Sequence, residues 1–116
     1  MNENILISKT LNFAARIIKL HNYLIKDKKE TIIAKQIIRS GTSIGANISE
    51  AQQAQSKRDF ISKMSIALKE ANETKYWLRL LKEVGSISET DSKEYFYLTD
   101  ELMRILIKIL KSSKEE

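Results

Sequence analysis

The chain contains no cysteine and no proline, and it has three glycines and one histidine in 116 residues. Without cysteine the protein can form neither a disulfide framework nor a thiolate metal site, and catalysis by a thiol is excluded. The single histidine, His21, supplies too few nitrogen ligands for a zinc cluster. We therefore expect no metal, no cofactor and no catalytic residue.

The absence of proline favours a helical protein. Proline makes up roughly 5% of an average sequence, and in the interior of a helix it costs about 3 kcal/mol. No apolar run reaches the roughly 18 residues of a membrane span, and the first residues, MNENI, do not resemble a signal peptide. With 42% hydrophobic residues and a net charge of +5, the chain should fold as a soluble cytoplasmic protein without a membrane segment.

Four segments show the three-and-four spacing of amphipathic helices, over residues 3–26, 30–54, 57–84 and 90–112. Their apolar stripes are formed by Leu6, Phe13, Ile17, Leu20 and Leu24; by Ile33, Ile37, Ile44, Ile48 and Ala51; by Phe60, Ile61, Met64, Ala67, Leu68, Ala71 and Leu78; and by Tyr95, Leu98, Leu102, Ile105 and Ile109. Connections of a few residues force neighbouring helices to be antiparallel. The sequence predicts an all-α protein, an antiparallel up-down-up-down four-helix bundle with a single domain over residues 1–116.

Glycines and capping residues indicate where these helices continue and end. The apolar stripe of the second segment keeps its phase across Gly41 and Gly45, which predicts one continuous helix. Gly85 stands where a left-handed C-terminal cap is expected. Three pairs have the spacing of a helix start: Asp27 with Glu30, Ser56 with Asp59, and Asp91 with Glu94.

The apolar surface exceeds what one bundle core needs. In the third segment a second apolar cluster lies nearly opposite the core stripe, and it consists of Ile66, Trp77, Leu80 and Val84. Exposed apolar clusters of this kind mark interfaces, and tryptophan is enriched at their centres. We predict that this cluster contributes to a homo-oligomer interface; the alternative is that Trp77 covers one end of the core.

The charge is unevenly distributed. Residues 1–40 carry eight Lys or Arg and three Asp or Glu, whereas residues 86–116 carry five and seven. The cations of the first segment fall within about 100° of arc, and no carboxylate interrupts them between Lys9 and Asp27. We call the set the basic stripe, and it comprises Lys9, Arg16, Lys19, Lys26, Lys28 and Lys29.

A basic face that is poor in acids is typical of a protein that binds a polyanion. The stripe therefore predicts nucleic-acid binding through backbone phosphates with little sequence specificity; an ordinary solvated helix face and acidic membrane lipid are the alternatives. Tyr23 lies at the centre of the stripe. Its ring could stack on an unpaired base or lie along the lysine stems.

Catalytic patterns are weak. Arg16 and His21 have an Arg-x4-His spacing that is loosely similar to that of HEPN ribonucleases. Members of that family usually have a polar residue after the arginine, whereas Ile17 stands here, and helical phasing separates Arg16 from His21 by about 140°. The stretch from Gly41 to Gly45 resembles a phosphate loop only in composition, since no strand precedes it and no Gly-Lys-Ser/Thr follows. We expect no enzyme.

Three stretches resemble a known bacterial four-helix-bundle family, named after proteins encoded in 23S rRNA intervening sequences. They are residues 36–50 (QIIRSGTSIGANISE), 56–60 (SKRDF) and 66–78 (IALKEANETKYWL). The signature Ser-Ile-x-x-Asn-Ile-x-Glu is present as Ser43, Ile44, Asn47, Ile48 and Glu50. Ala51 follows it where many members have glycine.

The resemblance implies an all-helical homopentamer that binds RNA or DNA and is not an enzyme. A related branch, the accessory protein of diversity-generating retroelements, binds nucleic acid and a reverse transcriptase. In this chain Arg39, Ser43, Asn47 and Glu50 fall on one polar side of their helix. They should form hydrogen-bonded contacts between helices or subunits; the alternative is a solvated face.

Three functional hypotheses therefore stand at this point. The first is a non-enzymatic homo-oligomer with a nucleic-acid-binding surface. The second is a protein-interaction adaptor that recruits a partner such as a reverse transcriptase. The third is a ribonuclease using Arg16 and His21.

Overall fold

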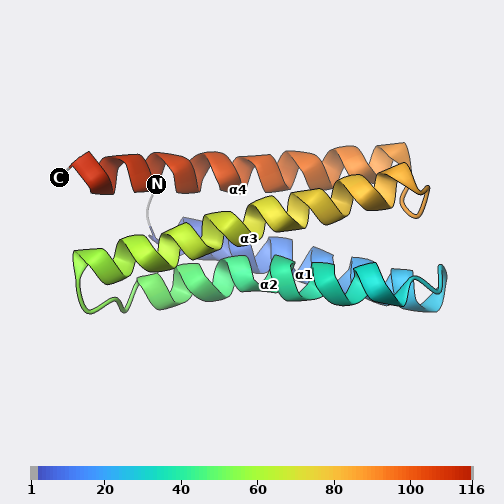
Figure 1. Ribbon diagram of the computed structural model, residues 1–116, viewed down its shortest axis with the longest axis horizontal. Helices are drawn as coiled ribbons and strands as arrows, with labels where there is room; N and C mark the ends of the chain where they lie inside the picture. The colour runs from blue at the N-terminus through green and yellow to red at the C-terminus, as the bar shows by residue number, and fades with distance from the viewer. Residues whose placement is uncertain (1–2, 116) are drawn as a thin grey trace.

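The computed structural model describes residues 3–115, which form four long helices joined by short loops (Figure 1). The helices are α1 (Glu3–Lys26), α2 (Thr31–Ala51), α3 (Lys57–Glu83) and α4 (Glu89–Glu115). Each helix packs along the next one in the chain, as expected for short connections. The prediction of an all-α, up-down four-helix bundle is confirmed. The α1–α2 and α3–α4 loops lie at one end of the bundle, and the C-terminus of α4 lies at the other.

The apolar stripes of all four helices meet in one core. Fully buried side chains come from every helix, for example Phe13, Ile44, Leu78 and Leu102. Burying an aliphatic or aromatic side chain of this size contributes about 1.5–3 kcal/mol. The other predicted stripe residues are either buried or partly buried against this core. The helical periodicity therefore predicted the inward faces of α1, α2 and α3 correctly.

In α4 the predicted stripe is off: Leu102 is its only fully buried member, and the buried face continues through Leu106 and Leu110. Apolar residues flank the predicted α4 stripe, so the three-and-four spacing alone did not fix which part of the apolar arc faces the core.

The α2 helix is continuous through both of its inner glycines, as predicted. A Cβ atom added to Gly41 would lie 2.8 Å from Ile17 Cγ2, and one added to Gly45 would lie 2.9 Å from Thr10 Cβ. Real Cβ atoms do not come this close to other carbons. The two glycines therefore allow α1 and α2 to approach more closely than alanines would.

Two predicted helix ends are confirmed in atomic detail. Ser56 Oγ accepts a hydrogen bond from the Asp59 N–H at 3.0 Å and caps α3. Gly85 has φ +78° after the end of α3. The Gly85 N–H donates to the Lys82 carbonyl at 3.1 Å and the Ser86 N–H to the Leu81 carbonyl at 2.9 Å. These are the two bonds of a Schellman cap.

Two other predicted helix starts are wrong. The Glu30 carboxylate, and not Asp27, caps α2 by accepting from the Ile33 N–H at 3.2 Å. Ser88 Oγ accepts from the Asp91 N–H at 3.0 Å, so α4 starts at Glu89, one residue before the predicted position. In both cases a second side-chain oxygen lies three residues from the predicted cap, that of Glu30 for α2 and that of Ser88 for α4. The path of the loop determines which of the two oxygens reaches the free N–H groups of the helix. The α2 helix also ends at Ala51, three residues earlier than predicted.

The α1–α4 side differs from the other three sides of the bundle. The backbones of α1 and α4 approach closely at far fewer places than those of the other neighbouring helices. Two clefts, of about 200 and 80 Å³, open between these helices. The α1–α4 side is therefore the loosest part of the fold.

Candidate nucleic-acid interface

The fold divides the basic stripe into two groups, and the first group faces α4. Lys9 Nζ lies 3.3 Å from Glu101 Oε2, and the Arg16 guanidinium pairs with the Glu94 carboxylate. The four side chains retain between 26% and 53% of their exposure, so each pair contributes at most about 1 kcal/mol. Two of the six cations are thus neutralised by acids of α4.

The second group is free. Lys19, Lys26, Lys28 and Lys29 are exposed, and within residues 3–115 none of them forms an ion pair. They occupy the C-terminal part of α1 and the following loop, and Lys28 Nζ lies 5.9 Å from the centroid of the Tyr23 ring. We call these four lysines the basic end.

The larger α1–α4 cleft lies beside the basic end. Its lining combines apolar, aromatic and charged side chains: Arg16, Lys19, Leu20, Tyr23, Ile87, Asp91, Glu94 and Tyr95. The Tyr95 hydroxyl donates to the Arg16 carbonyl at 3.2 Å. Burial raises the pKa of Tyr95, although the nearby positive charge of Arg16 opposes this, so the hydroxyl stays protonated as a hydrogen-bond donor.

The structure does not bring Arg16 and His21 together. Arg16 points toward α4, whereas His21 Nδ1 lies 3.0 Å from Asn22 Oδ1 and is not among the residues that line the cleft. Across residues 3–115, no three His, Cys, Asp or Glu side chains are grouped as a metal site would require. In the same part of the chain, no helix is long and apolar enough to cross a membrane.

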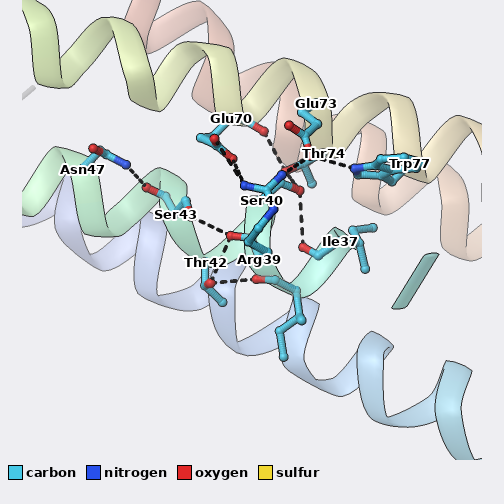
Figure 2. Close-up of polar contacts among 11 residues, drawn as sticks. Ile37, Arg39, Ser40, Thr42, Ser43, Asn47, Glu70, Glu73, Thr74 and Trp77 are labelled. Atoms are coloured by element: carbon cyan, nitrogen blue, oxygen red, sulfur yellow. Dashed lines mark hydrogen bonds and ion pairs between the residues drawn. The ribbon is translucent and has the colours of Figure 1, made fainter. Parts of the chain in front are cut away.

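Arg39 of the predicted polar side of α2 forms the centre of an inter-helix network (Figure 2). Its guanidinium lies between two α3 carboxylates, with Nη1 3.1 Å from Glu70 Oε2 and Nη2 in contact with Glu73. The Trp77 indole N–H donates to the Glu73 carboxylate at 3.0 Å. That bond and the Arg39 charge lower the pKa of Glu73, and the hydrogen bond to Glu73 raises the pKa of Arg39. Arg39 is therefore held by α3.

The signature residues have mostly structural contacts. Ser43 Oγ donates to the Arg39 carbonyl at 2.6 Å and Asn47 Nδ2 donates to the Ser43 carbonyl at 2.8 Å, both within α2. Glu50 pairs with Lys63 of α3 at 3.4 Å. Ile44 and Ile48 are buried in the core. The predicted contact between helices is therefore present for Arg39 and Glu50, whereas Ser43 and Asn47 bond within α2.

The predicted interface cluster on α3 is only partly exposed. Ile66 and Val84 keep 40% and 58% of their exposure, whereas Trp77 and Leu80 are half-buried. Trp77 also packs against the core. It therefore covers the core, as the alternative suggested, and still presents part of its ring at the surface.

A second apolar surface, which the predicted interface residues did not include, lies on α1. Leu11, Ile18 and Ile25 are 66%, 43% and 38% exposed. Each of the three directly follows a buried residue in the sequence. One residue is a rotation of about 100° around the helix axis, so these side chains point away from the core. They recur every seven residues, and Ala14 and His21 stand between them. We call these five residues the outer α1 stripe. Its signal in the sequence is a second three-and-four repeat, shifted by one residue from the core repeat.

Comparisons with known proteins agree with this architecture. Residues 2–108 match the family described as 23S rRNA-intervening sequence protein. The chain is 50% identical to a protein from the S23 ribosomal protein family of Bacteroides thetaiotaomicron VPI-5482, whose crystal structure is described as that of a protein with unknown function. The match covers 96% of this chain and 99% of that one, with a TM-score of 0.93. No curated protein matches. The chain belongs to the 23S rRNA-intervening sequence protein family.

Proposed function

We propose that this protein is a cytoplasmic, non-enzymatic homo-oligomer that binds RNA or DNA through backbone phosphates, with the basic end as the contact surface. One observation carries the proposal: four lysines gather at one end of the bundle without a carboxylate partner in the described chain. Unpaired cations are free to replace the counterions of a phosphate backbone. The family supplies the expectation of a pentamer, which would repeat the basic end around the assembly and strengthen binding through avidity.

The salt dependence of binding tests which cations take part. Each phosphate neutralised on duplex DNA lowers the log-log salt slope by about 0.9. The four lysines of the basic end therefore predict a slope of about −3.6 per contacting subunit, whereas all six residues of the basic stripe would give about −5. The slope would be measured by fluorescence anisotropy with duplex DNA and structured RNA across salt concentrations.

Charge reversal tests the surface itself. The triple variant Lys26→Glu, Lys28→Glu, Lys29→Glu should weaken binding by about tenfold or more at roughly 50 mM salt. A matched control reverses three exposed lysines near the C-terminus of α4, at the other end of the bundle: Lys108→Glu, Lys111→Glu and Lys114→Glu. The control has the same net charge, so equal losses in the two triple variants would contradict the proposed surface.

Assembly would use the exposed apolar residues. The outer α1 stripe exposes Leu11 and Ile18, and Ile66 of α3 and Val84, directly after α3, are exposed as well. Exposed apolar residues of this kind form surfaces that a second subunit covers. We expect light scattering to give an oligomer mass for the native protein and a lower mass for Leu11→Glu/Ile18→Glu or Ile66→Glu/Val84→Glu. A monomer mass at micromolar concentration would contradict the oligomer. A monomer that binds a different protein through the outer α1 stripe would fit the adaptor hypothesis.

A further inference from the structure

The larger α1–α4 cleft has a mixed polar and apolar lining that includes two tyrosine rings. Its volume is about 200 Å³, which is below the roughly 300–1,000 Å³ of pockets for drug-sized ligands and suits a single planar ring system. Leu20 and Ile87 are 5% and 6% exposed and form its apolar part. Tyr23 and Tyr95 contribute aromatic rings from the two facing helices, and aromatic rings stack on nucleobases.

The charged groups of the cleft are not all satisfied by the protein. Glu94 is engaged by Arg16. The exposed Asp91 carboxylate, in contrast, has no ion pair or hydrogen-bond donor among residues 3–115. Arg16 Nε has no acceptor in the described chain either, but it is buried, and the rest of the guanidinium pairs with Glu94. The cleft thus combines a free carboxylate, that of Asp91, with a free ammonium group, that of Lys19.

We propose that this cleft binds an unpaired guanine base of a single-stranded segment, an inference that rests on the proposed nucleic-acid binding. Guanine presents two N–H donor groups beside its O6 acceptor. The donors match the Asp91 carboxylate and the acceptor matches the free Lys19 ammonium. Adenine and cytosine place a ring-nitrogen acceptor beside their amino group, which the carboxylate would repel.

The inference is tested by comparing two fluorescent RNA oligomers, a short oligouridine and the same oligomer with one central guanine. A bidentate base contact is worth about 1–3 kcal/mol, so the guanine oligomer should bind about fivefold more tightly or better. Asp91→Asn should remove this preference and leave oligouridine binding within about twofold, because the amide replaces one acceptor oxygen with a donor. Urea unfolding checks that the variant is folded.

The matched control is Glu83→Gln, which removes the same charge from an exposed side chain at the same end of the bundle, outside the cleft. It should keep the guanine preference. Equal affinity for the two oligomers, or an unchanged preference in Asp91→Asn, would overturn the guanine site and leave the proposed phosphate binding intact.

A titration with free guanosine monophosphate separates the two ideas further. Binding in the cleft should shift the methyl NMR signals of Leu20 and Ile87. If these signals shift but neither oligomer binds at low salt, the cleft is supported and the proposed nucleic-acid function fails. If the signals do not shift and neither oligomer binds, both are overturned.

Discussion

Gly41→Ala tests why α2 contains a glycine where a helix would favour alanine. In a helix interior, alanine is preferred over glycine by about 1 kcal/mol. In this fold, however, the new Cβ would lie 2.8 Å from Ile17 Cγ2 and 3.0 Å from Ile17 Cγ1. Both carbons are bonded directly to the Ile17 Cβ, so only a movement of α1 or α2 can relieve the contact. Overpacking of this kind costs about 1–3 kcal/mol, and we expect a net destabilisation of about 1 kcal/mol.

The decisive measurement is the same change in an Ile17→Ala background. Ile17 is fully buried, and its truncation should itself cost about 2–5 kcal/mol. Ile17→Ala removes Cγ1 and Cγ2 and leaves only Cβ, 3.3 Å from the new Cβ at position 41. In that background Gly41→Ala should stabilise the protein by up to about 1 kcal/mol through helix propensity. Urea unfolding followed by circular dichroism would be carried out at one protein concentration, because assembly shifts apparent stability.

The sign of the effect is the test. If Gly41→Ala has the same sign in both backgrounds, contact with Ile17 is not the reason for the glycine. Gly85→Ala is the control. An alanine there would be strained by the backbone angle φ +78° alone, because no atom lies within 4 Å of the added Cβ. It should cost about 1 kcal/mol in either background.

Three further predictions concern the polar surface. The double variant Glu94→Gln/Glu101→Gln removes the carboxylate partners of Arg16 and Lys9. Duplex DNA should then bind more tightly, and the log-log salt slope measured by fluorescence anisotropy should become steeper by about two units. An unchanged slope would show that these two cations do not reach phosphate. The pKa of Glu73 is lowered from 4.5, mainly by the hydrogen bond from Trp77. The ionised Glu73 carboxylate therefore stabilises the folded protein above pH 4.5, and this contribution is lost as the pH falls through the lowered pKa. The stability difference between native protein and Glu73→Gln in urea should shrink between about pH 7 and pH 3, and a constant difference would refute this. Ser56→Ala should cost about 1 kcal/mol by removing the α3 cap, and an unchanged urea midpoint would contradict it.

Features that depend on neighbours along the chain were predictable. Helical phase requires only the three-and-four spacing, and it identified the inward faces of α1, α2 and α3 and the continuity of α2 through Gly41 and Gly45. In α4 apolar residues cover a wider arc, and only packing decided that Leu106 and Leu110 face the core. The caps at Ser56 and Gly85 followed from local chemistry as well. The start of α2 was predicted wrongly, because Asp27 and Glu30 both offer a carboxylate and only the path of the loop places Glu30 beside the Ile33 N–H.

The charged surface could be predicted only in part. The spacing of the lysines and Arg16 was enough to predict a basic face on α1, since residues on one face are set by the helical period. It could not determine which helix that face meets. The partners of Arg16 and Lys9 come 78 and 92 residues later in the chain, from the acidic side of α4, and Asp91 reaches the cleft by the same packing. The tertiary structure alone decided which cations remain free to bind, because packing brings together charges that helical periodicity cannot relate.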